Sequence, residues 1–129
     1  MKKLLLLLVL VLTSFSMKAG DWIKVYEDST YTVFLEDEYD EDYDGYLVWL
    51  KCVYKTSQKL GKNKYYKYFI SLVQYNSSFT QSRDLKTIAY NKNGKVVDSS
   101  EPYYPEWEYI VPDSVGQLLA EIFEEDWVQ

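Results

Sequence analysis

The sequence contains no histidine and only one cysteine in 129 residues. Without histidine, the chain lacks the usual general base, a common metal-ligating side chain and any histidine-containing catalytic triad. Glycine is also scarce, with five residues, and no glycine-rich phosphate-binding loop is visible. We therefore expect a protein that acts by binding rather than by catalysis, and that needs no catalytic cofactor.

The single cysteine, Cys52, cannot form a disulfide within the chain. It falls inside an apolar stretch, where an isolated cysteine is more often a small buried hydrophobic residue than a nucleophile. The stability of the fold must then come from packing.

Long hydrophobic runs are missing too, apart from the run Leu4 to Leu12 behind the basic start Met1-Lys2-Lys3. A membrane helix needs roughly 20 apolar residues, whereas a basic start, a short apolar run and small residues are typical of a signal peptide. We expect a signal peptide at residues 1–19 and one mature domain at residues 20–129. The product would be exported to the periplasm or the cell exterior, where it could associate with the cell surface, without stable membrane insertion.

Positive charge is limited to 14 lysines and arginines against 20 acids, a formal net charge of −6. Removing residues 1–19 takes away Lys2, Lys3 and Lys18 but no acid, which brings the charge to −9. Such a charge repels the phosphates of nucleic acids and anionic membrane surfaces. Basic or neutral partners and cations remain, and no nucleic-acid partner is expected.

The mature region is rich in strand-forming patterns. Trp22 to Tyr26 and Tyr31 to Leu35 alternate apolar and polar residues, and Tyr65 to Tyr75 is aromatic and β-branched, so each predicts a strand. Gly45 to Tyr54 is apolar on both faces, which predicts a central strand. One of its faces would carry Tyr46, Val48, Leu50, Cys52 and Tyr54, and the other Leu47, Trp49 and Val53.

We expect polar loops at Ser57–Lys64, before the strand at Tyr65 to Tyr75, and at residues 76–82, after it. Two more strands and a helix follow the second loop. Leu85 to Tyr90 and Val96 to Ser99 flank a turn in which Asn93-Gly94 predicts a tight hairpin with positive φ angles. Ser114 with Gln117 three residues later is a capping-box pattern. Apolar residues follow it at helical spacing, namely Val115, Leu118, Leu119, Ile122 and Phe123. Strands closed by one helix predict an α+β fold.

Four segments of the chain resemble the bacterial surface-adhesin protein E family. They are Trp22-Ile23-Lys24-Val25, the strand Val48-Trp49-Leu50-Lys51 followed by Tyr54, the hairpin from Tyr90 to Val97, and the run from Trp107 to Leu119. The resemblance implies a single antiparallel sheet of about six strands with the C-terminal helix packed on one face, the concave one. It also implies adhesion, because the named family member binds host matrix proteins.

Members of that family often tether the helix to the sheet through a disulfide, and the corresponding regions here are Asn76-Ser77 and Phe123. The tether is therefore absent from this chain. We expect Phe123 to hold the helix by apolar burial instead, worth up to roughly 3 kcal/mol for a large side chain.

The segment from Asp40 to Gly45 fits the pattern D-x-D-x-D-G, which can wrap Ca²⁺. The ligands would be the carboxylates of Asp40, Asp42 and Asp44 and the carbonyl of Tyr46. A complete helix-loop-helix calcium hand is excluded, because the twelfth position is Lys51 rather than glutamate. A solvated acidic loop explains the same pattern. Calcium is thus the one ion that the sequence suggests.

Tyrosine is abundant, with 14 residues. Tyrosine and tryptophan are favoured at interfaces because a large rigid apolar body ends in a hydrogen-bonding tip. In the strand at Tyr65 to Tyr75 we expect ordinary packing. Ser100 to Pro112 is different, because its prolines disfavour a helix and it carries the predicted partner-binding residues Tyr103, Tyr104 and Trp107.

Our first hypothesis is an exported, non-enzymatic, adhesin-like protein that recognises a protein partner through an aromatic surface, either a sheet face or the segment Ser100 to Pro112. One alternative is a periplasmic protein that binds a small ligand or Ca²⁺, with the cleft between sheet and helix as its pocket. Another is an inhibitor of an exported enzyme that uses the same aromatic segment. The sequence leaves the oligomeric state open.

Overall fold

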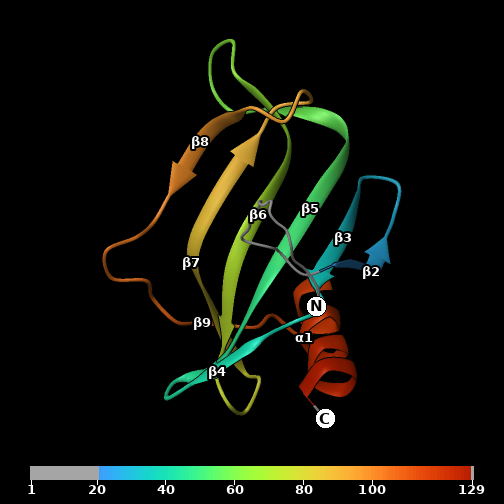
Figure 1. Ribbon diagram of the computed structural model, residues 1–129. Coiled ribbons are helices and arrows are strands. Elements are labelled where there is room, and N and C mark those ends of the chain that lie inside the picture. The colour runs from blue at the N-terminus through green and yellow to red at the C-terminus, as the bar shows by residue number, and fades with distance from the viewer. Residues whose placement is uncertain (1–20, 129) are drawn as a thin grey trace, which may run out of the picture.

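The computed structural model describes residues 21–128, so the predicted signal peptide lies outside the described residues. Its main feature is an antiparallel sheet with the strand order β2-β3-β5-β6-β7-β8 (Figure 1). These strands are β2 (Trp22–Glu27), β3 (Tyr31–Glu36), β5 (Gly45–Lys59), β6 (Tyr65–Tyr75), β7 (Gln81–Tyr90) and β8 (Val96–Ser100).

Two short strands and one helix complete the fold. Strand β4 (Asp40–Asp42) pairs with β5, and β9 (Glu108–Tyr109) pairs with β7. The helix α1 (Val115–Phe123) continues into a π-helical turn, η1 (Glu124–Val128). Within residues 21–128, no helix has the length and apolar character required to cross a membrane. The predicted α+β fold, a single sheet with a C-terminal helix, is confirmed.

Strand β5 lies inside the sheet, between β3 and β6, as its apolar faces predict. Val48 lies opposite Val73, and Leu50 lies opposite both Leu35 and Ser71. Because cross-strand partners share a face, the strands present one continuous apolar surface to the helix. The buried cluster on it contains Val33, Leu35, Val48, Leu50, Cys52, Val73, Tyr75, Leu119, Ala120 and Phe123.

The helix is attached to the sheet by a cluster of aromatic rings around Phe123, which has no exposed surface. The ring centroids of Tyr75, Tyr39 and Phe79 lie 5.5, 5.6 and 6.1 Å from that of Phe123. Beyond it, the indole Nε1 of Trp127 donates to the Glu36 carbonyl at 2.8 Å. The expectation that Phe123 holds the helix by apolar burial is confirmed.

The turn after β6 brings Phe79 into this cluster at a backbone φ of 57°. That left-handed conformation is unfavourable for a bulky residue. The Asn76 side-chain oxygen accepts from the backbone N–H groups of Thr80 at 2.9 Å and Gln81 at 3.0 Å, which fixes the turn. The Phe79 ring stacks on Tyr46 with centroids 5.3 Å apart. Burial of the ring therefore offsets the strained backbone.

The capping pattern at the start of α1 forms in part. Ser114 Oγ accepts from the Gln117 N–H at 3.1 Å, as predicted. Gln117 Oε1, however, accepts from the Asp113 N–H at 2.6 Å instead of the Ser114 N–H, which the full capping box requires. Asp113 has a φ of 61°, and this left-handed residue turns its N–H toward the Gln117 side chain.

Two strands extend several residues beyond their predicted boundaries. Strand β5 continues to Lys59 through the predicted polar loop, because Gln58 still pairs with Tyr66 beyond a bulge. Strand β7 begins at Gln81, earlier than Leu85, because β9 pairs with its first two residues. Both extensions consist mainly of polar residues. They form strands by backbone pairing, which the search for apolar alternation does not detect.

The hairpin between β7 and β8 is present, but its turn differs from the prediction. Gly94 has a φ of 82°, whereas Asn93 is not in the left-handed region. Asn91 N–H donates to the Lys95 carbonyl at 2.8 Å, and Gly94 N–H donates to the Asn91 carbonyl at 2.9 Å. The turn therefore spans three residues with one left-handed glycine, a common alternative to the two-residue loop.

The aromatic cluster predicts a large difference between two positions on the same helix. Replacing Phe123 with alanine should lower the free energy of unfolding by about 3–5 kcal/mol, because it opens a cavity under the helix. Leu118→Ala is the matched control, since Leu118 is 40% exposed, and should change it by less than about 1 kcal/mol. Urea unfolding followed by circular dichroism measures both values. Equal losses would contradict the attachment described here.

Candidate functional site

The segment from Ser100 to Pro112 runs from the end of β8 to β9, which it includes and which pairs with β7 (Figure 1). Tyr103 and Tyr104 lie at its tip and are 88% and 81% exposed. Their rings meet edge to face with centroids 4.8 Å apart. Both rings are therefore exposed to solvent. Packing against the rest of the chain does not explain why large aromatic residues occur here.

The same segment is held firmly at its second half. The Trp107 ring lies 4.2 Å from the guanidinium carbon of Arg83 on β7, a stacked cation–π contact. Arg83 also donates to the Pro105 carbonyl at 3.4 Å. Further along, Ile110 N–H donates to the Thr80 carbonyl at 3.0 Å. Trp107 is therefore an anchor of the segment, whereas Tyr103 and Tyr104 are its free surface.

Arg83 is fixed in turn by polar groups on its own side of the sheet. Its Nε donates to Gln74 Oε1 at 2.8 Å, and Gln74 is only 1% exposed. Gln74 Nε2 donates to both carboxylate oxygens of Asp42, at 3.0 and 3.1 Å. Asp44 lies 3.8 Å from Arg83 as a weak ion pair. This network joins Asp42 and Asp44 to Gln74 on β6 and Arg83 on β7, and through Arg83 to the segment from Ser100 to Pro112.

A groove of about 420 Å³ lies beneath the segment, between its backbone and β7. Tyr104 and Pro105 form one wall of this groove. Glu106 and Glu108 also line it from the segment, and Arg83 and Asp84 line it from β7. Arg83 is already engaged with Trp107 and Gln74, so the groove presents mainly negative charge beside an exposed ring.

The predicted calcium loop forms a β-hairpin. Asp40 to Asp42 is strand β4, and Asp42 pairs with Gly45. Gly45 has a φ of 143°, and a Cβ there would lie 1.9 Å from the Tyr75 carbonyl oxygen, so only glycine fits. In the described part of the chain, no three acidic or thiol groups gather in a way that could hold a metal ion. Asp42 and Asp44 instead contact Gln74 and Arg83.

Tyr46, the fourth predicted calcium ligand, belongs to strand β5. It pairs with Glu41 on one side and Tyr75 on the other, and its ring stacks on Phe79. Asp40, Asp42 and Tyr46 are thus paired within the sheet instead of forming an open loop. Calcium binding stays a prediction of the sequence pattern.

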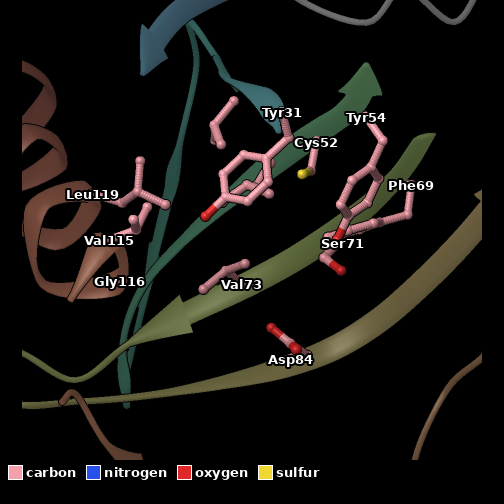
Figure 2. Close-up of a pocket in the computed structure, with 12 residues that line it drawn as sticks. Tyr31, Cys52, Tyr54, Phe69, Ser71, Val73, Asp84, Val115, Gly116 and Leu119 are labelled. Carbon is pink, nitrogen blue, oxygen red and sulfur yellow. The ribbon is translucent and has the colours of Figure 1, made fainter. Parts of the chain in front are cut away.

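A second cavity, of about 320 Å³, lies between α1 and the sheet (Figure 2). Tyr31, Leu50, Phe69, Val73, Val115 and Leu119 form its largely apolar walls. Tyr54, Ser71 and Asp84 contribute polar atoms, and Ser71 Oγ lies 2.6 Å from the Thr87 hydroxyl. This is the cleft that the sequence analysis considered as a ligand pocket.

Burial raises the pKa values of three titratable groups that line this cavity. It raises the pKa of Cys52 to about 11 and that of Tyr54 to about 12. Asp84 keeps much of its surface in solvent. Partial burial of its carboxyl group nevertheless raises its pKa, and the negative charge of Glu108 adds a smaller increase. Cys52 is thus a protonated, 5% exposed core residue, as predicted, and not an activated nucleophile.

The opposite face of the sheet carries a second group of rings. Lys51 Nζ lies 5.0, 5.6 and 6.0 Å from the ring centroids of Tyr68, Trp22 and Phe34. All three rings are half-buried, since neighbouring side chains and the lysine stem cover part of each. This face is more enclosed than the segment at Tyr103 and Tyr104.

Sequence reasoning found the exposed tyrosines but missed Arg83 and Asp84. Their only signal was a charged pair just before the apolar alternation that starts at Leu85, and such a pair is equally typical of a loop. A bulge between Lys86 and Asp84 in the pairing with β6 breaks the alternation there. The faces of Arg83 and Asp84 therefore cannot be extrapolated from the alternation that starts at Leu85. As successive residues of β7, the two face opposite sides of the sheet.

A model of the surface-adhesin protein E family matches residues 22–123. No curated protein and no solved structure matches the chain. The matched residues include every strand and the whole of α1, so the match covers the sheet, the aromatic segment and both cavities.

The buried thiol makes a direct prediction about reactivity. With its pKa at about 11, Cys52 should hold about 100-fold less thiolate at pH 8 than a thiol with the ordinary value near 9. Modification by Ellman's reagent should be slower in the native protein by at least that factor than in denaturant. A native rate equal to the unfolded rate would show that Cys52 is accessible.

The hairpin geometry predicts no response to calcium. Asp42 and Asp44 already contact Gln74 and Arg83, so Ca²⁺ at millimolar concentration should leave the melting temperature and the tyrosine fluorescence unchanged. Mg²⁺ at the same ionic strength is the control for screening. A saturable rise in melting temperature with Ca²⁺ alone would instead support the predicted ligand set.

Proposed function

The chain belongs to the surface-adhesin protein E family, and on that premise we propose that it is an exported, non-enzymatic protein that binds a protein partner through the exposed rings of the segment from Ser100 to Pro112. The family suggests a surface adhesin of a bacterial cell. The absence of histidine from the sequence supports a binding role over a catalytic one.

The exposure of Tyr103 and Tyr104 carries this proposal. Large exposed rings lose little conformational freedom when a partner covers them, because a tyrosine side chain has few rotatable bonds. Each ring also offers a hydroxyl group for a hydrogen bond. Such residues are often the ones that dominate the energy of a protein interface.

The anchoring of the segment strengthens the argument. Trp107 stacks on Arg83, and β9 pairs with β7, so the segment is tied to the sheet close to the two tyrosines. A surface that is ordered before binding avoids part of the entropy cost of association. By comparison, the rings around Lys51 on the opposite face are half-buried and offer less area.

The charge around the tyrosines indicates the chemistry of the partner. Glu101 and Glu106 flank the exposed rings in the sequence, and both residues are exposed. Glu106 and Glu108 line the groove beneath Tyr104. A partner with lysine or arginine side chains at the contact would be attracted to this surface, and its association would weaken as salt rises.

The proposal predicts that the tyrosine pair is needed for binding but not for folding. Surface plasmon resonance on the immobilised protein would be run against purified extracellular-matrix proteins and against the envelope fraction of the producing cell. Replacing both Tyr103 and Tyr104 with alanine should weaken binding by about 10-fold or more, or ~1.4 kcal/mol. The melting temperature should stay within about 1 °C, because neither ring is buried.

Tyr65→Ala is the matched control, because Tyr65 is 50% exposed and lies at the start of β6. It should leave binding unchanged. Two results would contradict the proposal: a double variant that binds as well as the wild type, or a wild-type protein that binds no member of the panel above background.

A further inference from the structure

The cavity between α1 and the sheet is lined by neither Tyr103 nor Tyr104, although Asp84 also borders the groove beneath Tyr104. It has the features of a ligand pocket. Its volume of about 320 Å³ lies at the lower end of the range for small-molecule sites, roughly 300–1,000 Å³. Figure 2 shows Asp84 of β7 across the cavity from Val115 and Leu119 of α1. The cavity therefore has an apolar wall on the helix side and an acidic group on the sheet side.

In the described part of the chain, Asp84 has no basic ion-pair partner. None of the ion pairs formed by residues 21–128 includes it, and the charged group that acts on it is another acid, Glu108. Arg83, the adjacent residue on β7, is bound to Gln74 and Trp107 instead. Asp84 and Arg83 have cross-strand partners Val73 and Gln74, so their side chains lie on opposite faces of the sheet.

The remaining polar groups near the cavity cannot neutralise this carboxylate. Tyr31, Tyr54 and Ser71 contribute hydroxyl groups, which carry no charge, and Ser71 is engaged with Thr87 at 2.6 Å. A partly desolvated carboxylate without a counter-ion is unfavourable. A cation that enters the cavity would remove this cost, whereas an anion would increase it.

We propose that the cavity binds a small organic amine, with its protonated nitrogen at the carboxylate of Asp84 and its apolar body against Phe69, Val73 and Leu119. The rings of Tyr31, Tyr54 and Phe69 favour an aromatic body, because ring edges and faces pack well against one another. The strongly acidic balance of the chain, 20 acids against 14 basic residues, favours the entry of a cation as well.

A matched set of indole compounds tests the proposal. Tryptamine carries an amine, tryptophol a hydroxyl and indole-3-propionate a carboxylate on similar apolar bodies. Dissociation constants would be measured from amide shifts in ¹H–¹⁵N spectra, with Ser71, Val73 and Gly116 as reporters. Tryptamine should bind at least about 10-fold more tightly than tryptophol, and indole-3-propionate should bind most weakly.

Asp84→Asn should lower the tryptamine affinity to that of tryptophol without changing the tryptophol affinity. Asp98→Asn is the control, because Asp98 pairs with Ala89 on the same sheet face and its loss changes the net charge equally. Tryptamine binding should also lower the Asp84 pKa in an NMR titration, since a cation favours the ionised form. This readout would not move if Asp84 only supported the fold.

The proposal is overturned if the three compounds bind equally, if Asp84→Asn leaves tryptamine binding intact, or if no compound shifts the reporter amides at millimolar concentration. The double alanine variant at Tyr103 and Tyr104 should keep its tryptamine affinity. Failure of the amine site is thereby distinguishable from failure of the partner-binding segment.

Discussion

The packing of the Phe123 ring among Tyr39, Tyr75, Phe79 and Trp127 is the contact on which the rest of the structure depends. The chain has one cysteine, so no covalent link between helix and sheet is available. A helix of nine residues is too short to be stable by itself in water. It persists here because its apolar face is buried, and the ring cluster supplies much of that burial.

The position of the helix decides which surfaces the sheet offers. Because α1 lies on the side of β2 and β3 (Figure 1), the face of β7 remains open beside it. The cavity with Asp84 forms at that boundary, and the aromatic segment, which follows β8, pairs with the same strand β7 through β9. One strand, β7, thus supplies Arg83 to anchor the segment on one face and Asp84 to line the cavity on the other.

The sequence predicted the parts of the fold that follow from apolar periodicity. The central strand was predicted from a continuous apolar run, and the closing helix with Phe123 from apolar residues at a spacing of 3.6 residues. Two features were not predicted, namely the hairpin of Asp40 to Asp42 and the start of β7, because both consist of polar residues without apolar alternation. Among the candidate site residues, Tyr103 and Tyr104 could be predicted because they lie in a segment that contains prolines. The roles of Arg83 and Asp84 depend on a bulge and on partners far along the chain, which periodicity does not encode.

A double-mutant cycle between Phe79 and Phe123 tests the central claim most directly. The single variants Phe79→Leu and Phe123→Leu and the double variant would be unfolded in urea, so that the coupling energy between the two rings follows from the four free energies. Direct ring contact in one buried cluster predicts a favourable coupling of about 0.5–1.5 kcal/mol. A coupling near zero would contradict the account, because the helix would then be held to the sheet by something other than these rings.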